Sequence, residues 1–278
     1  MKIISVDLYD YFNHQKPENC ALDFKCYLHD DQNFPTRRHP AMLVIPGGGY
    51  KYCSPREADP IALQYFAKGF NVFIINYSCA PAKYPVAFKE ASMAMAYIKL
   101  ESAKLHVVQN KVSAVGFSAG GHLCGCLANL FDDDVLNFLG ENKKFVRPDA
   151  VLLIYPVVSY LQTPHLGSFE NLTGDNTDLA KQLSLETRVT PNSSPMFLVT
   201  TYGDQVVSCK NSLVLALAYQ NAGVPFSFHL FETGPHGLST ATNLVYTAEN
   251  LPIHSKNYEQ WIAHSLNYLE EKGFVITD

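Results

Sequence analysis

The sequence lacks most of the features that would tie it to nucleic acid or to a membrane. Its 278 residues carry only 21 lysines and arginines and a net charge of −5, with no arginine-rich tract. Nucleic-acid binding needs clustered Lys and Arg, so no nucleic-acid partner is expected. The stretch MKIISVDLYDYF is too polar, and its apolar run too short, for a signal peptide or a membrane span. We therefore expect no membrane association either.

Cysteine motifs are also missing. The seven cysteines are irregularly spaced and include no C-x-x-C pair. Zinc-binding and redox motifs are therefore unsupported, and we expect neither a metal nor an organic cofactor. Reduced, mostly buried thiols are the simplest interpretation, and they favour a cytoplasmic protein.

What is present is a regular alternation of apolar strands and amphipathic helices. Strands are predicted at 2–9, 21–28, 41–46, 70–78, 111–117, 150–158, 196–203 and 225–232, and helices at 59–69, 86–105, 120–131, 211–223 and 258–273. Continuously apolar strands that alternate with helices indicate an α/β fold, with a mostly parallel sheet covered on both faces. Residues 1–278 are expected to form one domain. Residues 157–195 are too long for an ordinary connection and predict a small lid or cap insertion.

Chemically active residue types follow four of the predicted strands. They are the glycines of PGGGY (46–50), the serine of GFSAG (116–120), Asp204 in YGDQVV and His236 in TGPHGLS. Loops at the carboxyl ends of parallel strands share one edge of the sheet, so these residues should converge. Gly-x-Ser-x-Gly between a strand and a helix is typical of a nucleophile elbow. A serine nucleophile needs a histidine base, which in turn needs a carboxylate.

Other polar residues near these loops are better explained by structure. His229 and His264 fall inside predicted elements, and His122 lies four residues after the serine, where a packed or capping histidine is expected. Asp175 has turn residues around it but no strand directly before it. Arg56 and Glu57 follow the glycine loop and are expected to anchor that loop or the next helix rather than to react.

The chain resembles the α/β hydrolases, and within them the acetyl-esterase and lipase group that includes acetyl xylan esterases. The resemblance covers nearly the whole chain and depends on VIPGGGY, NYSCAPAKYP, GFSAGGHL, TTYGDQVV and ETGPHGLS. It implies an α/β-hydrolase fold with Ser118 as nucleophile, Asp204 as acid and His236 as base. The sequence departs from the family at Pro46, where the usual glycine motif begins with His.

The glycine loop is expected to supply an oxyanion hole. Attack on an ester carbonyl builds an oxyanion, which preplaced N–H groups stabilise. The expected donors are the N–H groups of Gly47, Gly48 and Ala119, with Gly49 as a further candidate. PGGGY lacks the Lys-Ser/Thr ending of a P-loop, which disfavours a phosphate site.

These observations predict a serine hydrolase that cleaves short acyl esters, acetyl favoured, through an acyl-enzyme. The expected partner is a small soluble ester, for which the family resemblance implies an acetylated sugar or xylo-oligosaccharide, and a homodimer is left open. Five aromatic residues border the site, of which two are expected only to pack: Tyr50, Tyr52, Phe117, Tyr155 and Tyr202. Tyr50, Phe117 and, in the insertion, His165 are predicted to contact the substrate. An amidase or peptidase of the same fold, or a non-catalytic binding protein, remain alternatives.

Overall fold

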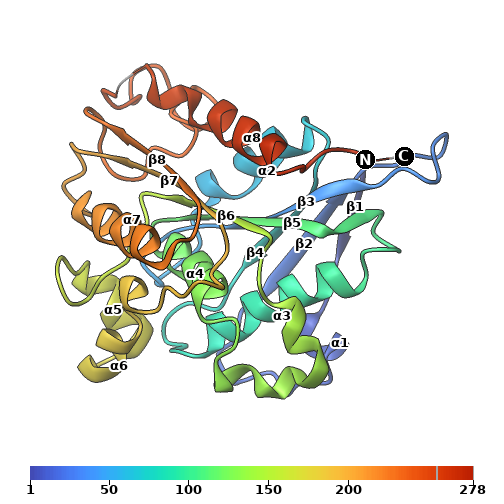
Figure 1. Cartoon of the computed structure of the whole chain (residues 1–278), viewed down its shortest axis with the longest axis horizontal. Coiled ribbons are helices and arrows are strands. Elements are labelled where there is room, and N and C mark those ends of the chain that lie inside the picture. The colour runs from blue at the N-terminus through green and yellow to red at the C-terminus, as the bar shows by residue number, and fades with distance from the viewer. Residues whose placement is uncertain (255, 278) are drawn as a thin grey trace.

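The computed structural model describes residues 1–254 and 256–277, and one eight-stranded sheet forms its centre (Figure 1). The strands are β1 (Lys2–Ser5), β2 (Asp23–Leu28), β3 (His39–Ile45), β4 (Asn71–Asn76), β5 (Val107–Phe117), β6 (Ala150–Ile154), β7 (Met196–Thr201) and β8 (Phe226–Phe231). Their order is β1-β2-β4-β3-β5-β6-β7-β8. β2 pairs antiparallel with both β1 and β4, and β3 to β8 run parallel. The predicted, mostly parallel sheet is confirmed.

Helices cover both faces of this sheet, because its strands are apolar on both sides. In β3, Ala41, Leu43 and Ile45 belong to one core, and the alternate residues Met42 and Val44 belong to the other. The helices are α1 (Leu8–Tyr11), α2 (Asp59–Phe66), α3 (Val86–Leu100), α4 (Ser118–Asn129), α5 (Leu166–Thr173), α6 (Thr177–Gln182), α7 (Lys210–Ala222) and α8 (Trp261–Glu271). α2 and α8 cover one face, and α1, α3, α4 and α7 cover the other (Figure 1).

Some element boundaries differ from the prediction for local reasons. The first predicted strand ends at Ser5, because the Asp7 side chain accepts the N–H groups of Tyr9 and Asp10 and so caps α1. The strand predicted at 150–158 ends at Ile154, since Tyr155 has a φ of +38°. Asp59, which its place before Pro60 predicts as the N-cap of this helix, is instead the first residue of α2, and its side chain accepts a hydrogen bond from Tyr27.

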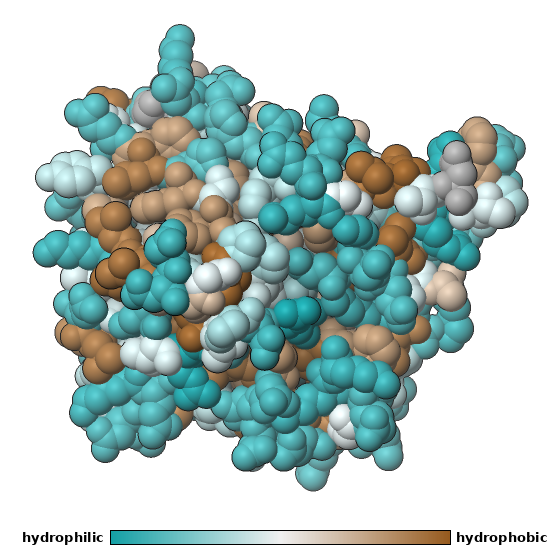
Figure 2. All heavy atoms as spheres, viewed as in Figure 1, coloured by the Kyte–Doolittle hydropathy of each residue, from teal (hydrophilic) through white to brown (hydrophobic). Residues whose placement is uncertain are grey.

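The surface of the molecule is largely hydrophilic on the face shown in Figure 2. Hydrophobic residues gather there beside β8 and α7, elements that carry the exposed Leu230, Leu213 and Leu217. Within the described residues, no helix combines the length and the apolar character needed to cross a bilayer. All seven cysteines are free thiols, as expected, and four of them are buried.

Candidate active site

Ser118 stands at a sharp turn between β5 and α4. Its φ is +52°, a backbone conformation that residues with a side chain seldom adopt. The turn is compact: a Cβ on Gly120 would lie only 2.2 Å from the carbonyl oxygen of Pro46. The strained backbone presents the Ser118 hydroxyl at the carboxyl edge of the sheet and leaves the N–H of Ala119 free at the start of α4.

Ser118, His236 and Asp204 form a continuous chain of hydrogen bonds. His236 Nε2 lies 2.8 Å from Ser118 Oγ, and His236 Nδ1 lies 2.6 Å from Asp204 Oδ2. Asp204 follows β7, and its other carboxylate oxygen accepts the backbone N–H groups of Val206 and Val207, each at 2.9 Å. The Asp204 side chain is fully buried, whereas that of His236 is 15% exposed. The three residues that the sequence singled out are therefore brought together.

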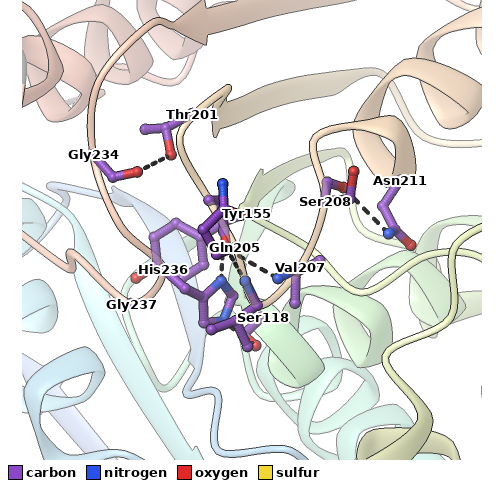
Figure 3. Close-up of polar contacts among 12 residues, drawn as sticks. Ser118, Tyr155, Thr201, Gln205, Val207, Ser208, Asn211, Gly234, His236 and Gly237 are labelled. Carbon is purple, nitrogen blue, oxygen red and sulfur yellow. Dashed lines mark hydrogen bonds and ion pairs between the residues drawn. The ribbon is translucent and has the colours of Figure 1, made fainter.

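The loop that carries His236 is fastened to the neighbouring strand. Thr201, the last residue of β7, donates its hydroxyl to the carbonyl oxygen of Gly234 at 2.6 Å (Figure 3). The ring of Tyr155 packs edge-on against the imidazole of His236, with 5.0 Å between ring centroids. These two contacts place the imidazole beside Ser118 (Figure 3).

The glycine loop after β3 lies beside Ser118, but one of its predicted donors is already used. The N–H of Gly47 donates to Glu57 Oε2 at 2.9 Å, so the prediction of Gly47 as an oxyanion donor is wrong. Gly48 and Gly49 both line the pocket that contains Ser118. Gly48 has a φ of +129°, and a Cβ there would lie 2.0 Å from the carbonyl oxygen of Tyr52, so only glycine fits. The N–H groups available for an oxyanion are therefore those of Gly48, Gly49 and Ala119.

His122 anchors the glycine loop from behind, as a packed histidine. Its Nε2–H donates to the carbonyl oxygen of Leu183 at 2.9 Å, and its Nδ1 accepts the hydroxyl of Tyr50 at 2.8 Å. Burial lowers the pKa of His122 to about 4, so the ring is neutral near pH 7. Tyr50 is thus directed into the core and does not line the pocket.

The pocket around Ser118 has a volume of about 300 Å³, and most of the residues that line it carry a polar group on the side chain. Its walls include Lys51, Tyr52, Arg56, Glu57, His165, Asn171, Val206 and His236. A second cavity, of about 620 Å³, shares Lys51 and Tyr52 with it but contains no member of the Ser-His-Asp chain. The smaller pocket is therefore the candidate site.

Of the five aromatic residues expected to border the site, only Tyr52 lines the pocket. Tyr50 and Phe117 are buried, and Phe117 packs between the rings of Tyr155 and Trp261. The prediction that these two residues contact a substrate is therefore wrong. Tyr155 is also buried, so three of the five aromatic residues pack, not two.

The segment 157–195 lies beside the pocket through its first helix. His165 lines the pocket, and its Nδ1 is 2.8 Å from the hydroxyl of Ser168. Burial, followed by the charge of His236, lowers the pKa of His165. From the same helix, α5, Asn171 donates its side-chain amide to the carbonyl oxygen of Gly49 at 2.9 Å. The segment thus contacts the glycine loop directly, and its role as a lid stays a prediction.

The sequence did not predict that Glu57 and Tyr155 are hydrogen-bonded to each other behind the pocket. Tyr155 donates its hydroxyl to Glu57 Oε1 at 2.7 Å, and both side chains are buried behind the pocket. The sequence suggested that Glu57 anchors the glycine loop, which the structure confirms. Tyr155 had no local signal beyond its place at the end of a strand.

Comparison with known proteins agrees with this geometry. The model of the BD-FAE family matches residues 27–219. Endo-1,4-beta-xylanase B of Butyrivibrio fibrisolvens is 33% identical over 240 residues, which are 84% of this chain and 37% of that protein. An acetylxylan esterase of Xylanibacter ruminicola is 26% identical over 230 residues, 80% of this chain and 44% of that protein. The chain thus spans less than half the length of these two relatives.

Among solved structures, the acetyl ester-xyloside bifunctional hydrolase of Caldicellulosiruptor lactoaceticus superposes with a TM-score of 0.80. The two chains are 31% identical, and the match covers 91% of this chain and 89% of that one. The family match spans more than half of the chain and includes the glycine loop and the serine turn. The chain therefore belongs to the BD-FAE family and is an esterase-like α/β hydrolase.

Proposed function

We propose that this chain is a serine esterase that removes short acyl groups, acetyl first, from a small polar alcohol. The observation that carries the proposal is the hydrogen-bonded chain Ser118–His236–Asp204 beside free N–H groups in one pocket. Because the Asp204 carboxylate holds the proton of His236 on Nδ1, Nε2 is free to accept the proton of the Ser118 hydroxyl.

In this proposal the reaction follows the order of contacts. Ser118 Oγ attacks the ester carbonyl while His236 takes its proton, and the N–H groups of Gly48, Gly49 and Ala119 stabilise the oxyanion. His236 then protonates the leaving alcohol, which gives an acyl-enzyme on Ser118. A water molecule, deprotonated by His236, attacks the acyl carbonyl, and the proton returns to Ser118 as the carboxylic acid leaves.

The pocket favours a short acyl group and a polar alcohol. Val206 is the one aliphatic side chain in its lining, so the pocket offers no continuous aliphatic wall against which a long alkyl chain could pack. The other side chains, which include Lys51, Arg56 and Asn171, offer hydrogen bonds to hydroxyl groups. Relatives with acetylxylan esterase and acetyl ester-xyloside hydrolase in their names favour an acetylated sugar or xylo-oligosaccharide.

The decisive experiment is Ser118→Ala with an aryl acetate and with acetylated xylo-oligosaccharides. Acetate release should fall by three or more orders of magnitude, and a fluorophosphonate probe that labels the native protein should no longer react. The exchange removes one hydroxyl and no packing, so the melting temperature should stay close to that of the native protein. A variant that kept a tenth of the native activity would refute the proposal.

Faster cleavage of an anilide than of the matching ester by the native protein would favour the amidase alternative.

A further inference from the structure

A buried carboxylate that the proposed reaction does not use lies beside the site. Glu57 ends the short helix Pro55–Glu57 and is only 4% exposed. Its Oε2 accepts the N–H of Gly47, and its Oε1 accepts the hydroxyl of Tyr155. In the part of the chain that the structure describes, it forms no ion pair with a lysine or arginine. A buried charge without a cation is costly, so its presence calls for a reason.

Glu57 joins two loops of the site that lie far apart in the sequence. On one side it holds Gly47, directly before the proposed oxyanion donors. On the other side it holds Tyr155, whose hydroxyl oxygen accepts the N–H of Ser239 at 3.0 Å. Ser239 follows His236 by three residues, and the indole N–H of Trp261 donates to its carbonyl oxygen at 2.9 Å. The Glu57 carboxylate thus holds the glycine loop in a defined position relative to the loop that carries His236.

The pattern of hydrogen bonds favours the ionised form of Glu57. The Tyr155 oxygen already accepts a hydrogen from Ser239, so its own hydrogen points to Glu57 Oε1. Both carboxylate oxygens therefore face donors, and a proton on either of them would meet no acceptor. The pKa of Glu57 is raised by burial, and its hydrogen bonds and the charges of His236 and Arg56 offset only part of that rise.

We propose that Glu57 is a positioning residue of the hydrolysis, which fixes the glycine loop against the histidine loop and adds a second negative charge near the imidazolium of His236. This inference rests on the proposed esterase function. Asp204 stabilises that imidazolium by direct contact, and Glu57 does so through space. The imidazolium in turn adds a positive charge near Glu57, besides that of Arg56.

The effect on pH dependence follows from the charges around the two residues. His236 is faced by Asp204, Glu57 and His165, and Glu57 is faced by His236 and Arg56 and by four tyrosines: Tyr77, Tyr155, Tyr246 and Tyr258. The tyrosines are neutral near pH 7 because burial raises the pKa of each. Loss of the Glu57 charge makes the imidazolium less favourable, so the base stays neutral to lower pH. The acid limb of the activity profile should then move to lower pH.

The test compares Glu57→Gln with Glu57→Asp and with a matched control, Glu90→Gln. Glu90 is also buried and also accepts a tyrosine hydroxyl and a backbone N–H, from Tyr9 and Ser78, but it lies outside the pocket. For E57Q we expect kcat/KM for an aryl acetate to fall about 10- to 100-fold, mainly in kcat, because the glycine loop and His236 lose their alignment with the ester carbonyl. Its acid limb should move down by about 0.5–1 pH unit.

The two other variants separate charge from structure. E57D keeps the negative charge, but its shorter side chain moves the carboxylate away from Gly47 and Tyr155. Its kcat/KM should therefore fall, while the acid limb of its pH–activity profile should stay in place. E90Q should lower the melting temperature and leave the acid limb where it is. An E57Q enzyme with an unmoved acid limb, or with kcat/KM within about threefold of the native value, would overturn the inference.

Two further results keep the inference separate from folding and from the proposed function. If E57Q does not fold, Tyr155→Phe decides, because it cuts the link to Ser239 and retains the Glu57 charge. A kcat within about threefold of native in Y155F would then overturn the inference. An active S118A enzyme would refute the esterase proposal itself, whereas inactive S118A with a native-like E57Q would refute only the role of Glu57.

Discussion

Removing the hydroxyl of Tyr50 should destabilise the fold by about 1–2 kcal/mol. That hydroxyl donates to His122 Nδ1 at 2.8 Å, and both residues are buried. The other ring nitrogen of His122 donates to Leu183, so Nδ1 has to accept a hydrogen bond. A buried acceptor left without a donor costs about 1–3 kcal/mol. The Cys126 thiol, 3.8 Å from the same nitrogen, is a weak donor, which favours the lower part of that range.

Tyr50→Phe can be compared with Tyr65→Phe in urea unfolding followed by circular dichroism at one pH. The Tyr65 hydroxyl lies 2.7 Å from Ser265 Oγ, and Ser265 also donates to the carbonyl oxygen of Ile262. Ser265 therefore keeps a partner in Y65F, and the loss should stay below about 1 kcal/mol. Y50F should lower the melting temperature by about 2–8 °C. A loss in Y65F as large as that in Y50F would refute the argument from the orphaned acceptor.

Three other predictions concern pH, metals and the acyl group. Because burial lowers the pKa of His122 from 6.5 to about 4, only the unfolded chain binds this proton between those values, so stability falls as the pH falls across that window, by up to about 3 kcal/mol. His122→Gln removes this contribution. If the free energy of unfolding fell by the same amount between pH 7 and 4 in the variant and in the native protein, the prediction would be contradicted. A chelator should leave esterase activity intact; loss that zinc or calcium restores would disprove a metal-free mechanism. Across aryl esters of two to twelve carbons, kcat/KM should be greatest for acetate, and a maximum at eight or more carbons would contradict the short-acyl proposal.

Features that depend on neighbouring residues could be predicted from the sequence. The apolar runs of β3, β5 and β7 each contain enough information to define a buried strand, and Gly116, Ser118 and Gly120 define the turn after β5. The edge where Ser118, Asp204 and His236 meet also followed from the sequence, because parallel strands deliver their loops to one side of a sheet. These inferences needed only local pattern and one rule of topology.

Features that depend on side-chain direction were decided by the tertiary structure. Phe117 adjoins the serine, yet it lies in the same core as Val115, on the face of the sheet covered by α2 and α8. Tyr50 follows the glycine loop, yet its φ of +56° accompanies a ring turned inward to His122, which is 72 residues away in the chain. Sequence position indicated that both residues lie near the site, but not in which direction their side chains point.

The use of Gly47 shows the same limit most clearly. A glycine loop predicts free N–H groups, but one of them, that of Gly47, donates to the carboxylate of Glu57, ten positions later in the chain. The chain turns back after the loop and buries this carboxylate against Gly47. The other oxygen of that carboxylate accepts the hydroxyl of Tyr155, which lies 98 residues further along the chain. The amino-acid sequence therefore determined which groups could react and where they would gather. Which N–H groups stay free was decided only when distant segments packed together, because a buried carboxylate must take its hydrogen bonds from whatever donors the fold brings to it.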